Sequence, residues 1–225
     1  MTAVGADPTP ITVFLLEDHD LVRRSVAQLL EVEPDMSVVG ESATVAGALD
    51  AIEATHPRVA MLDMRLQDGS GIDVCRDIRA AHPDIRCIML TSFVDDRAVL
   101  DAALAGASGF VLKKVRDNDI VRSIRQVASG ATMLDRAAVL ASLARMRDAG
   151  RDEFSPLTDS QRDLLTLIGL GQSNAEIAAV LETDIEQVRA DVAVLVRRLQ
   201  RERRKAAPGD GHDETNATSA EDVGL

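Results

Sequence analysis

Short apolar runs alternate with segments of helical periodicity from residue 11 to about residue 130, and this alternation restricts the fold more than any other feature of the chain. The apolar runs lie at residues 11–16, 37–40, 59–62, 87–90 and 109–112. Between them, apolar residues recur at intervals of three and four, as expected of helices that bury one face. Strand and helix repeated five times predict an α/β fold, namely a doubly wound five-stranded parallel sheet with helices on both faces.

Polar residues follow four of the five runs. Glu17 and Asp18 come after the first run, Asp63 after the third, Thr91 after the fourth and Lys113 after the fifth. The carboxyl ends of parallel strands lie along one edge of a sheet, so these side chains should converge on one crevice. Any one of them alone would be an ordinary strand end or helix cap, whereas the five together predict a functional site.

The chemistry of this set favours phosphoryl transfer. Clustered carboxylates without a soft ligand suit Mg2+, which prefers oxygen atoms in octahedral geometry. A lysine and a threonine hydroxyl opposite the acids would hold the oxygens of a phosphoryl group, and positioning with charge neutralisation supplies most of the catalysis in such sites. Asp63, placed shortly before the glycine-rich turn QDGSG, is the natural nucleophile for an aspartyl phosphate.

Residues 11–130 resemble the receiver domain of bacterial response regulators. The stretches LLEDHDLVRRSVAQLL, MLDMRLQDGSG, IMLTSF and GASGFVLKK stand in the order and spacing of that family. The resemblance implies the flavodoxin-like receiver fold and transfer of a phosphoryl group to Asp63 from the histidine of a sensor kinase. It also implies that Asp18, Asp63 and the main-chain carbonyl of Arg65 bind Mg2+, with Glu17 acting through a coordinated water.

The same resemblance assigns further residues. Thr91 and Lys113 would contact the phosphoryl oxygens, and Phe110 takes the place of the aromatic residue that swings inward with the threonine on activation. Phenylalanine has no hydroxyl to leave in water, so we expect its inward state to be easier to reach than that of tyrosine. Gln67 stands where the family often has proline, which should loosen the turn without removing a ligand. His19, beside the acids at the start of a helix, is interpreted as a surface cap rather than a phosphorelay residue.

After residue 130 the pattern becomes helical throughout. Residues 131–153 begin with alanine, leucine and methionine at helical spacing, which predicts a helical linker that the stretch AGRDEFSP interrupts. Residues 154–207 hold three helices, each opened by a capping residue with a partner three positions on: Thr158 with Gln161, Ser173 with Glu176, and Asp184 with Gln187. Helices joined this tightly predict a small all-α helix-turn-helix domain, although a helical bundle without a DNA role fits the periodicity equally.

The C-terminal segment resembles the DNA-binding domain of LuxR/NarL-type regulators over LTDSQRDLLTLIGLGQSNAEIAAVLETDIEQVRADVAVLVRRL. With the receiver in front, the whole chain resembles the two-component transcription factors of that family, and within it most of all the DevR/DosR subgroup. The resemblance implies a homodimer, formed on phosphorylation, that reads paired half-sites in double-stranded promoter DNA. Gln187, Arg189, Arg197 and Arg198 of the third helix are the candidate DNA-contacting residues.

The third helix departs from the family where it should touch DNA. Glu186 and Ala190 stand where relatives supply a lysine and an asparagine, and Asp191 adds another acid. Residues 155–205 contain eight basic and eight acidic residues, so the segment has no net positive charge. Phosphate contacts dominate DNA affinity, and the basic cluster that begins at Arg197 fits either a phosphate-binding role or a solvated helix end.

Composition limits other classes of function. The net charge of −12 argues against a general polyanion binder, and no apolar stretch is long enough to cross a bilayer, so no membrane partner is expected. The N-terminal stretch MTAVGADPTP lacks the pattern of an export signal, which predicts a cytoplasmic protein. Residues 208–225 are acidic and polar with interspersed glycine, and are predicted to be a disordered tail.

Three functions from different classes stay open. The favoured one is a phosphorylation-activated, DNA-binding transcriptional regulator that is not an enzyme. The second is a receiver-containing adaptor or antagonist whose degraded helix-turn-helix binds protein rather than operator DNA. The third is a Mg2+-dependent phosphohydrolase, which is disfavoured because no substrate-pocket motif accompanies the acids.

Overall fold

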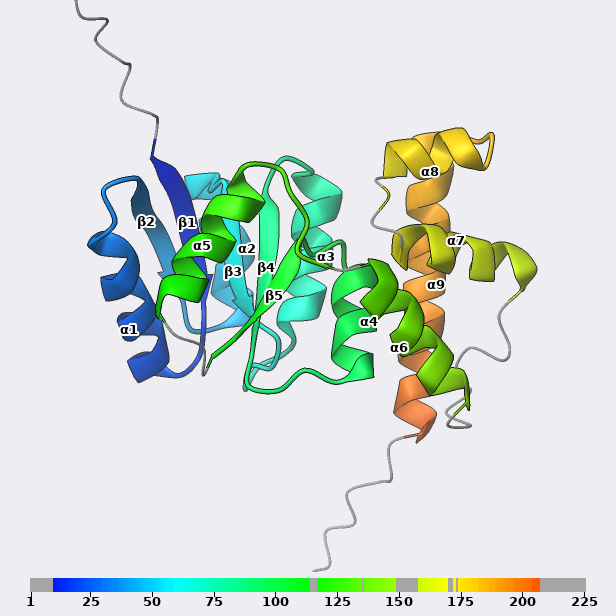
Figure 1. Ribbon diagram of the computed structural model, residues 1–225, viewed down its shortest axis with the longest axis horizontal. Helices are drawn as coiled ribbons and strands as arrows, with labels where there is room; N and C mark the ends of the chain where they lie inside the picture. The colour runs from blue at the N-terminus through cyan, green and yellow to red at the C-terminus, as the bar shows by residue number, and fades with distance from the viewer. Residues whose placement is uncertain are drawn as a thin grey trace, which may run out of the picture.

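A computed structural model describes residues 10–113, 117–134, 136–148, 158–169, 172 and 174–206. Within this part of the chain, five strands form one parallel sheet in the order β2-β1-β3-β4-β5 (Figure 1). The strands are β1 (Ile11–Leu16), β2 (Met36–Ser42), β3 (Val59–Asp63), β4 (Arg86–Thr91) and β5 (Gly109–Leu112). The predicted parallel sheet is therefore confirmed, and each strand contains the apolar run assigned to it.

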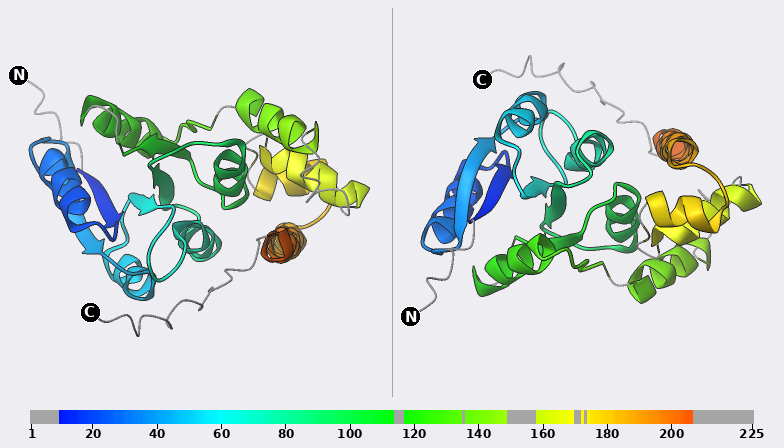
Figure 2. Two further views of the ribbon diagram at one scale, coloured as in Figure 1. Left: turned by 90° about the horizontal axis from the view of Figure 1, so that it is seen from below. Right: turned by 90° about the horizontal axis from the view of Figure 1, so that it is seen from above.

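Helices cover both faces of this sheet, as the two views of Figure 2 show. They are α1 (Asp20–Glu31), α2 (Val45–Thr55), α3 (Gly71–Ala81), α4 (Asp96–Leu104) and α5 (Asp117–Ala128). Successive side chains of a strand point to opposite faces, so each inner strand contributes side chains to two separate hydrophobic cores. In β1, Val13 and Leu15 pack with α1 and α5, whereas Phe14 and Leu16 pack with α2 and α3. The doubly wound architecture follows from strands that are apolar on both faces.

The carboxyl edge of the sheet is held by main-chain hydrogen bonds that continue past the strands. The N–H of Glu17 donates to the carbonyl of Ser42 at 3.1 Å, and the N–H of Lys113 donates to the carbonyl of Thr91 at 2.8 Å. Strands β1 and β3 are neighbours at the point where the strand order reverses, and ligands bind outside the carboxyl ends of open α/β sheets at such a point. The fold thus places the residues after β1 and β3 at this position.

The C-terminal part of the described chain is helical. It comprises α6 (Arg136–Asp148), α7 (Asp159–Gly169), α8 (Asn174–Val180) and α9 (Ile185–Ala206). Helices α7, α8 and α9 share a core that includes Leu164, Ile177, Val188 and Leu195. No described helix is both long enough and apolar enough to span a bilayer. The small all-α unit predicted after the sheet is confirmed, and α6 falls within the predicted linker.

Capping residues start these helices where the sequence predicted. The Thr158 N–H donates to Oε1 of Gln161 at 3.2 Å, and the Gln161 N–H donates to Oγ1 of Thr158 at 3.3 Å, which completes a capping box. Asp184 Oδ1 accepts from the Gln187 N–H at 2.7 Å, so Asp184 caps α9. The third predicted box includes Ser173, which lies outside the described residues.

Helix α4 joins the two parts of the molecule (Figure 1). Val139 of α6 is buried against Val99 and Leu100 of α4. At its other end α4 contributes Leu104 to the core of α7, α8 and α9. Residues 149–157, which include the predicted boundary between linker and C-terminal domain, and residues 207–225, which include the predicted tail, lie outside the described chain.

Candidate functional site

Three carboxylates meet at the carboxyl edge of the sheet and form what we call the acidic cluster: Glu17 and Asp18 after β1, and Asp63 at the end of β3. All three side chains are buried, with exposed fractions of 1% for Glu17, 8% for Asp18 and 5% for Asp63. The Lys113 ammonium, delivered by β5, lies 2.7 Å from Glu17 Oε2 and 2.8 Å from Asp63 Oδ2. Four of the five strand-end residues singled out in the sequence are therefore in mutual contact or adjacent.

The charges of this site are strongly coupled. Burial raises the pKa of Asp63, and the nearby charge of Glu17 raises it further, while Lys113 opposes both effects. Burial acts to lower the pKa of Lys113, but hydrogen bonds from its ammonium to Asp63 and Glu17 outweigh burial, so the pKa of Lys113 is raised. The ammonium is thus firmly protonated, and among the described residues this one lysine faces three carboxylates. The site retains negative charge that a cation would neutralise.

The donor atoms fit a hard divalent cation. One oxygen of each carboxylate is buried beside a nitrogen atom: Glu17 Oε2 and Asp63 Oδ2 lie 2.7 Å and 2.8 Å from Lys113 Nζ, and Asp18 Oδ1 lies 2.8 Å from His19 Nδ1. Ligand atoms of Glu17, Asp18, His19 and Asp63 all lie within 4.8 Å of one another. Oxygen donors at this density are what Mg2+ and similar ions require. The acidic cluster can therefore hold a divalent cation.

The loop after β3 holds the acidic cluster through hydrogen bonds that the sequence did not predict. The Gln67 N–H donates to Asp18 Oδ2 at 3.0 Å. Asp68 Oδ2 accepts from the Val45 N–H at 2.8 Å at the start of α2, and Ser70 Oγ accepts from the Ile72 N–H at 3.2 Å at the start of α3. Gln67 was expected to loosen this turn in place of proline. Because proline has no N–H to donate, glutamine instead supplies a hydrogen bond that ties the turn to Asp18.

Gly71 sets the position of Asp63 from the other side. A Cβ atom at Gly71 would lie 2.0 Å from the main-chain oxygen of Asp63, a separation that no side chain can occupy. The absence of a side chain lets the first turn of α3 approach the end of β3 this closely. The signal in the sequence was a glycine eight residues after the central aspartate, directly following a capping serine.

The side chains of Thr91 and Phe110 contact groups other than the acidic cluster. The Thr91 hydroxyl donates to the Phe93 carbonyl at 2.7 Å and accepts from the Phe93 N–H at 3.3 Å, so it is engaged with the loop before α4. Phe110 is half-buried and packs against the α4 side of the sheet, in the group that also contains Val139 of α6. Arg65 lies between loop and cluster, with its N–H donating to Asp63 Oδ1 at 3.3 Å.

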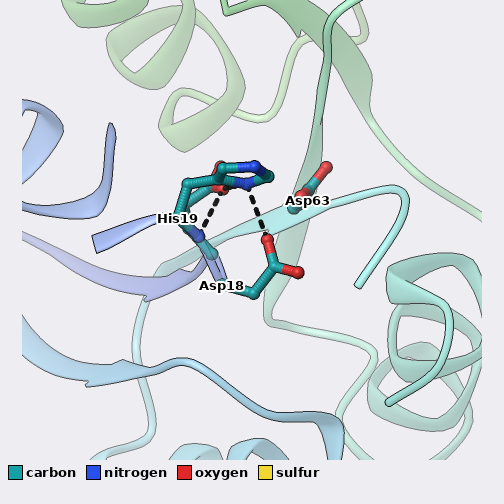
Figure 3. A group of neighbouring side chains, drawn as sticks. Asp18, His19 and Asp63 are labelled. Atoms are coloured by element: carbon teal, nitrogen blue, oxygen red, sulfur yellow. Dashed lines mark hydrogen bonds and ion pairs between the residues drawn. The ribbon is translucent and has the colours of Figure 1, made fainter. Parts of the chain in front are cut away.

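His19 does not act as the helix cap that its position suggested. It occupies the N-cap of α1, but its side chain accepts no capping hydrogen bond. Its ring turns toward the acids instead: Nδ1 lies 2.8 Å from Asp18 Oδ1 (Figure 3). The same nitrogen lies 3.2 Å from Glu17 Oε1. The interpretation as a cap was wrong because adjacent carboxylates attract an imidazole more strongly than the helix end does.

The candidate DNA-contacting residues lie on two sides of α9. Gln187, Arg189 and Arg197 are exposed. Arg198 is half-buried, and its Nη1 donates to Gln161 Oε1 of α7 at 2.9 Å, so it joins α9 to the capping box of α7. The side chains of the basic residues at positions 201–205 lie outside the described part of the structure.

Two of these side chains are paired with acids of the same helix. Arg189 Nη1 lies 2.8 Å from Glu186 Oε1, and Gln187 Nε2 donates to Asp191 Oδ1 at 2.9 Å. Both pairs are exposed to solvent, where such contacts contribute little to stability. They nevertheless occupy the donors that a nucleic acid would need. Any ligand read by Arg189 or Gln187 must compete with Glu186 or Asp191.

Comparisons with known proteins point to response regulators. Residues 13–125 match the family described as the response regulator receiver domain. The chain is 41% identical over 215 residues to the DNA-binding transcriptional activator DevR/DosR of Mycobacterium tuberculosis, which covers 89% of this chain and 99% of the relative. The similarity thus extends over both the sheet and the C-terminal helices.

Solved structures of response regulators are also similar to this chain. A two-component response regulator of the LuxR family from Aurantimonas has a TM-score of 0.55 at 28% identity, covering 62% of this chain and 99% of that one. The RcsB response regulator of Salmonella typhimurium has a TM-score of 0.54 at 20% identity over 85% of this chain and 93% of its own. The second likeness concerns the fold alone, and it spans both parts of the molecule.

Proposed function

Because the chain belongs to the response regulators of two-component systems, in their LuxR-type branch, we propose that Asp63 accepts a phosphoryl group from the histidine of a sensor kinase. The observation that carries this proposal is the placement of Asp63. Its carboxylate ends β3 at the switch point of the sheet, almost fully buried, between two further acids and a lysine ammonium 2.8 Å away. A buried carboxylate with an adjacent fixed cation is suited to nucleophilic attack on phosphorus.

Each side chain has a defined part in the transfer. A carboxylate oxygen of Asp63 attacks the phosphorus, and the bond from phosphorus to the donor nitrogen breaks. The Arg65 N–H, which donates to Asp63 Oδ1, holds the carboxylate in orientation. The Lys113 ammonium neutralises charge that develops on the phosphoryl oxygens, and positioning with such neutralisation is the main source of catalysis in phosphoryl transfer.

The cation site is proposed for Mg2+. Glu17, Asp18, Asp63 and the main-chain carbonyl of Arg65 would hold the ion, and when bound it supplies further neutralisation of the phosphoryl oxygens. Support comes from the three buried carboxylates, which face a single lysine ammonium among the described residues, and from the hard, all-oxygen character of this donor set. The Gln67 N–H keeps Asp18 Oδ2 in place, which leaves Asp18 Oδ1 directed into the site.

Phosphorylation would reach the C-terminal helices through Thr91 and Phe110. To contact a phosphoryl group, the Thr91 hydroxyl must leave the Phe93 carbonyl and so release the loop before α4. Phe110 packs beside the same helix and would move inward into the space that Thr91 vacates. Val139 of α6 packs against α4. A shift of α4 would therefore change the position of α6 and of the C-terminal helices that follow it.

The output that we propose is sequence-specific binding to promoter DNA by a homodimer. The relative at 41% identity is named a DNA-binding transcriptional activator, and α8, its turn and α9 form a helix-turn-helix with an exposed second helix. The proposed division is a receiver over 11–130, a linker over 131–153, a DNA-binding domain over 154–207 and a tail over 208–225. The adaptor alternative has no comparable support.

The phosphorylation step is tested with a small acyl-phosphate donor and Mg2+, followed by intact-mass spectrometry. The expected result is one added phosphoryl group in the wild-type chain and none in Asp63→Asn. Asp50→Asn, a change of the same kind at an exposed position of α2, should be labelled as the wild type is. Labelling that persists in Asp63→Asn would sink the assignment.

The DNA step is tested by recovering genomic fragments with the phosphorylated protein and sequencing them beside an Asp63→Asn control. Enrichment of a repeated half-site is expected in the phosphorylated sample. Arg189→Ala should then weaken binding to that site, whereas Glu186→Gln, which frees Arg189 and removes a negative charge, should strengthen it. If phosphorylated protein enriches no sequence, the helix-turn-helix does not read DNA and the adaptor function takes its place.

A further inference from the structure

We propose that His19 is an additional ligand of the cation in the acidic cluster, so that the site accepts borderline transition ions such as Co2+ and Ni2+ in addition to Mg2+. The juxtaposition that carries this inference is the His19 ring nitrogen beside one oxygen of Asp18 (Figure 3) and within 3.2 Å of one oxygen of Glu17. The inference rests on the cation site of the proposed function. It adds to that site a nitrogen donor, which changes the class of ion that is favoured.

The distances match one face of a coordination octahedron. Ligand bonds of about 2.1 Å at right angles separate neighbouring donor atoms by about 3.0 Å. His19 Nδ1 lies 2.8 Å from Asp18 Oδ1 and 3.2 Å from Glu17 Oε1, and all ligand atoms of the set, including that of Asp63, fall within 4.8 Å of one another. An ion placed among these atoms would meet the nitrogen and the carboxylate oxygens together.

The oxygen beside His19 is the one that lacks another partner. Asp18 Oδ2 accepts the Gln67 N–H, whereas the buried Asp18 Oδ1 lies against His19 Nδ1 at 2.8 Å and has no hydrogen bond to any other described residue. A buried carboxylate oxygen in this condition requires a positive neighbour. Either a cation shared with His19 or a protonated His19 ring would satisfy it, and these two arrangements differ in what the nitrogen binds.

The local backbone directs the ring into the site. His19 has extended dihedral angles, φ −80° and ψ 106°, and its N–H donates to Glu17 Oε1 at 3.1 Å. An N-cap side chain usually accepts a hydrogen bond from the first turn of its helix, but the His19 side chain makes no such bond to α1, so its ring is available to a ligand. The ring is also 68% exposed, which lets a hydrated ion arrive from solvent and exchange water for nitrogen.

A nitrogen donor alters ion preference in a predictable way. Imidazole suits the later first-row transition ions, while Mg2+ favours oxygen and keeps its water molecules. Loss of His19 should therefore weaken Co2+ and Ni2+ binding by about tenfold, weaken Mn2+ binding less, and leave Mg2+ binding within about twofold, since one ligand of moderate strength is removed. The ratio of affinities, rather than their absolute size, is the diagnostic quantity.

The test uses the full-length chain without an affinity tag and reads the metal directly. Mn2+ binding is titrated by electron paramagnetic resonance, and the bound ion is examined by electron spin echo envelope modulation for coupling to a 14N nucleus. Coupling is expected in the wild type and in His56→Asn, a histidine change on the opposite edge of the sheet at a left-handed position that asparagine tolerates. It should be absent in His19→Gln, in which an amide replaces the ring.

Two results would overturn the inference, and they differ in whether the cation site of the proposed function survives. If Mn2+ binds and Asp18→Asn abolishes its binding, but no nitrogen coupling is found, then His19 is a charged neighbour of the acids and the cation site itself survives. If Mn2+ binding is unaffected by Asp18→Asn, the ion lies elsewhere, and both the inference and the cation site of the proposed function fail.

Discussion

Replacing Lys113 with methionine should destabilise the protein by about 4 kcal/mol near pH 7, because it removes an ammonium that contacts two buried carboxylates at once. Lys113 Nζ lies 2.7 Å from Glu17 and 2.8 Å from Asp63, whose side chains are 1% and 5% exposed. Breaking a buried ion pair from one side typically costs about 3–5 kcal/mol. The loss of stability has an upper limit, because Asp63 can take up a proton instead of staying charged. Protonating a carboxyl about three pH units above its ordinary pKa costs about 4 kcal/mol.

The pH dependence of the variant follows from the same reasoning. Burial already raises the pKa of Asp63 in the wild type, and the loss of Lys113 raises it further. A folded-state pKa above the unfolded value means that the folded protein binds the proton more tightly. The corresponding stability is fully present below the unfolded pKa and is lost as pH rises through the folded one. The variant should therefore recover about 1.4 kcal/mol for each pH unit as pH falls from neutrality toward about 4.

Urea unfolding followed by circular dichroism measures this effect, since the chain contains no tryptophan or tyrosine for fluorescence. Removing one acid together with the lysine, in Glu17→Gln/Lys113→Met, should restore much of the lost stability. Added Mg2+ should also restore part of it. A Lys113→Met protein within about 1 kcal/mol of the wild type near pH 7, without Mg2+, would refute the account, because buried carboxylates cannot lose their counter-ion at so little cost.

Three further outcomes are expected. Gly71→Ala places a methyl group 2.0 Å from the Asp63 carbonyl oxygen, so it should lower the free energy of unfolding by about 3 kcal/mol and slow labelling of Asp63, as judged by urea unfolding and mass spectrometry. Phe110→Tyr should lower DNA affinity at equal phosphorylation, since its inward state must bury a hydroxyl; equal activation contradicts this reasoning. The Arg145 guanidinium, 2.9 Å from Asp96, holds the pKa of that carboxyl below its usual value, so their contact should persist above about pH 3.8 and weaken as pH falls through the lowered pKa. Asp96→Asn should therefore raise hydrogen exchange in α6, and unchanged exchange would show that packing of apolar side chains alone holds α6 on α4.

The sheet and its edge could be predicted because they depend on local patterns. Alternating apolar runs and helical spacing define each element, and parallel connections bring every strand end to one edge regardless of the details of packing. Glu17, Asp63 and Lys113 therefore could be placed together from sequence positions that lie far apart. The capping box of Thr158 and Gln161 was equally accessible, since both partners lie within one turn of helix.

Other features depended on contacts between distant segments. The hydrogen bond from Gln67 to Asp18 joins residues that are 49 positions apart, and the direction of the Thr91 hydroxyl depends on the loop that happens to lie beside it. The close approach of Gly71 to Asp63 was likewise invisible until α3 was packed on the sheet. Each is a matter of orientation or distance, which residue type and spacing leave open.

The sequence by itself determined which residues reach the carboxyl edge of the sheet and what chemistry they can perform there, because strand periodicity and residue type are local properties. The tertiary structure alone decided that His19 turns to the acids rather than to its helix. It also decided that α4 carries α6 on one side and contributes Leu104 to the C-terminal core. Both outcomes depend on which groups lie next to each other in the folded protein, and the sequence pattern alone does not fix these contacts.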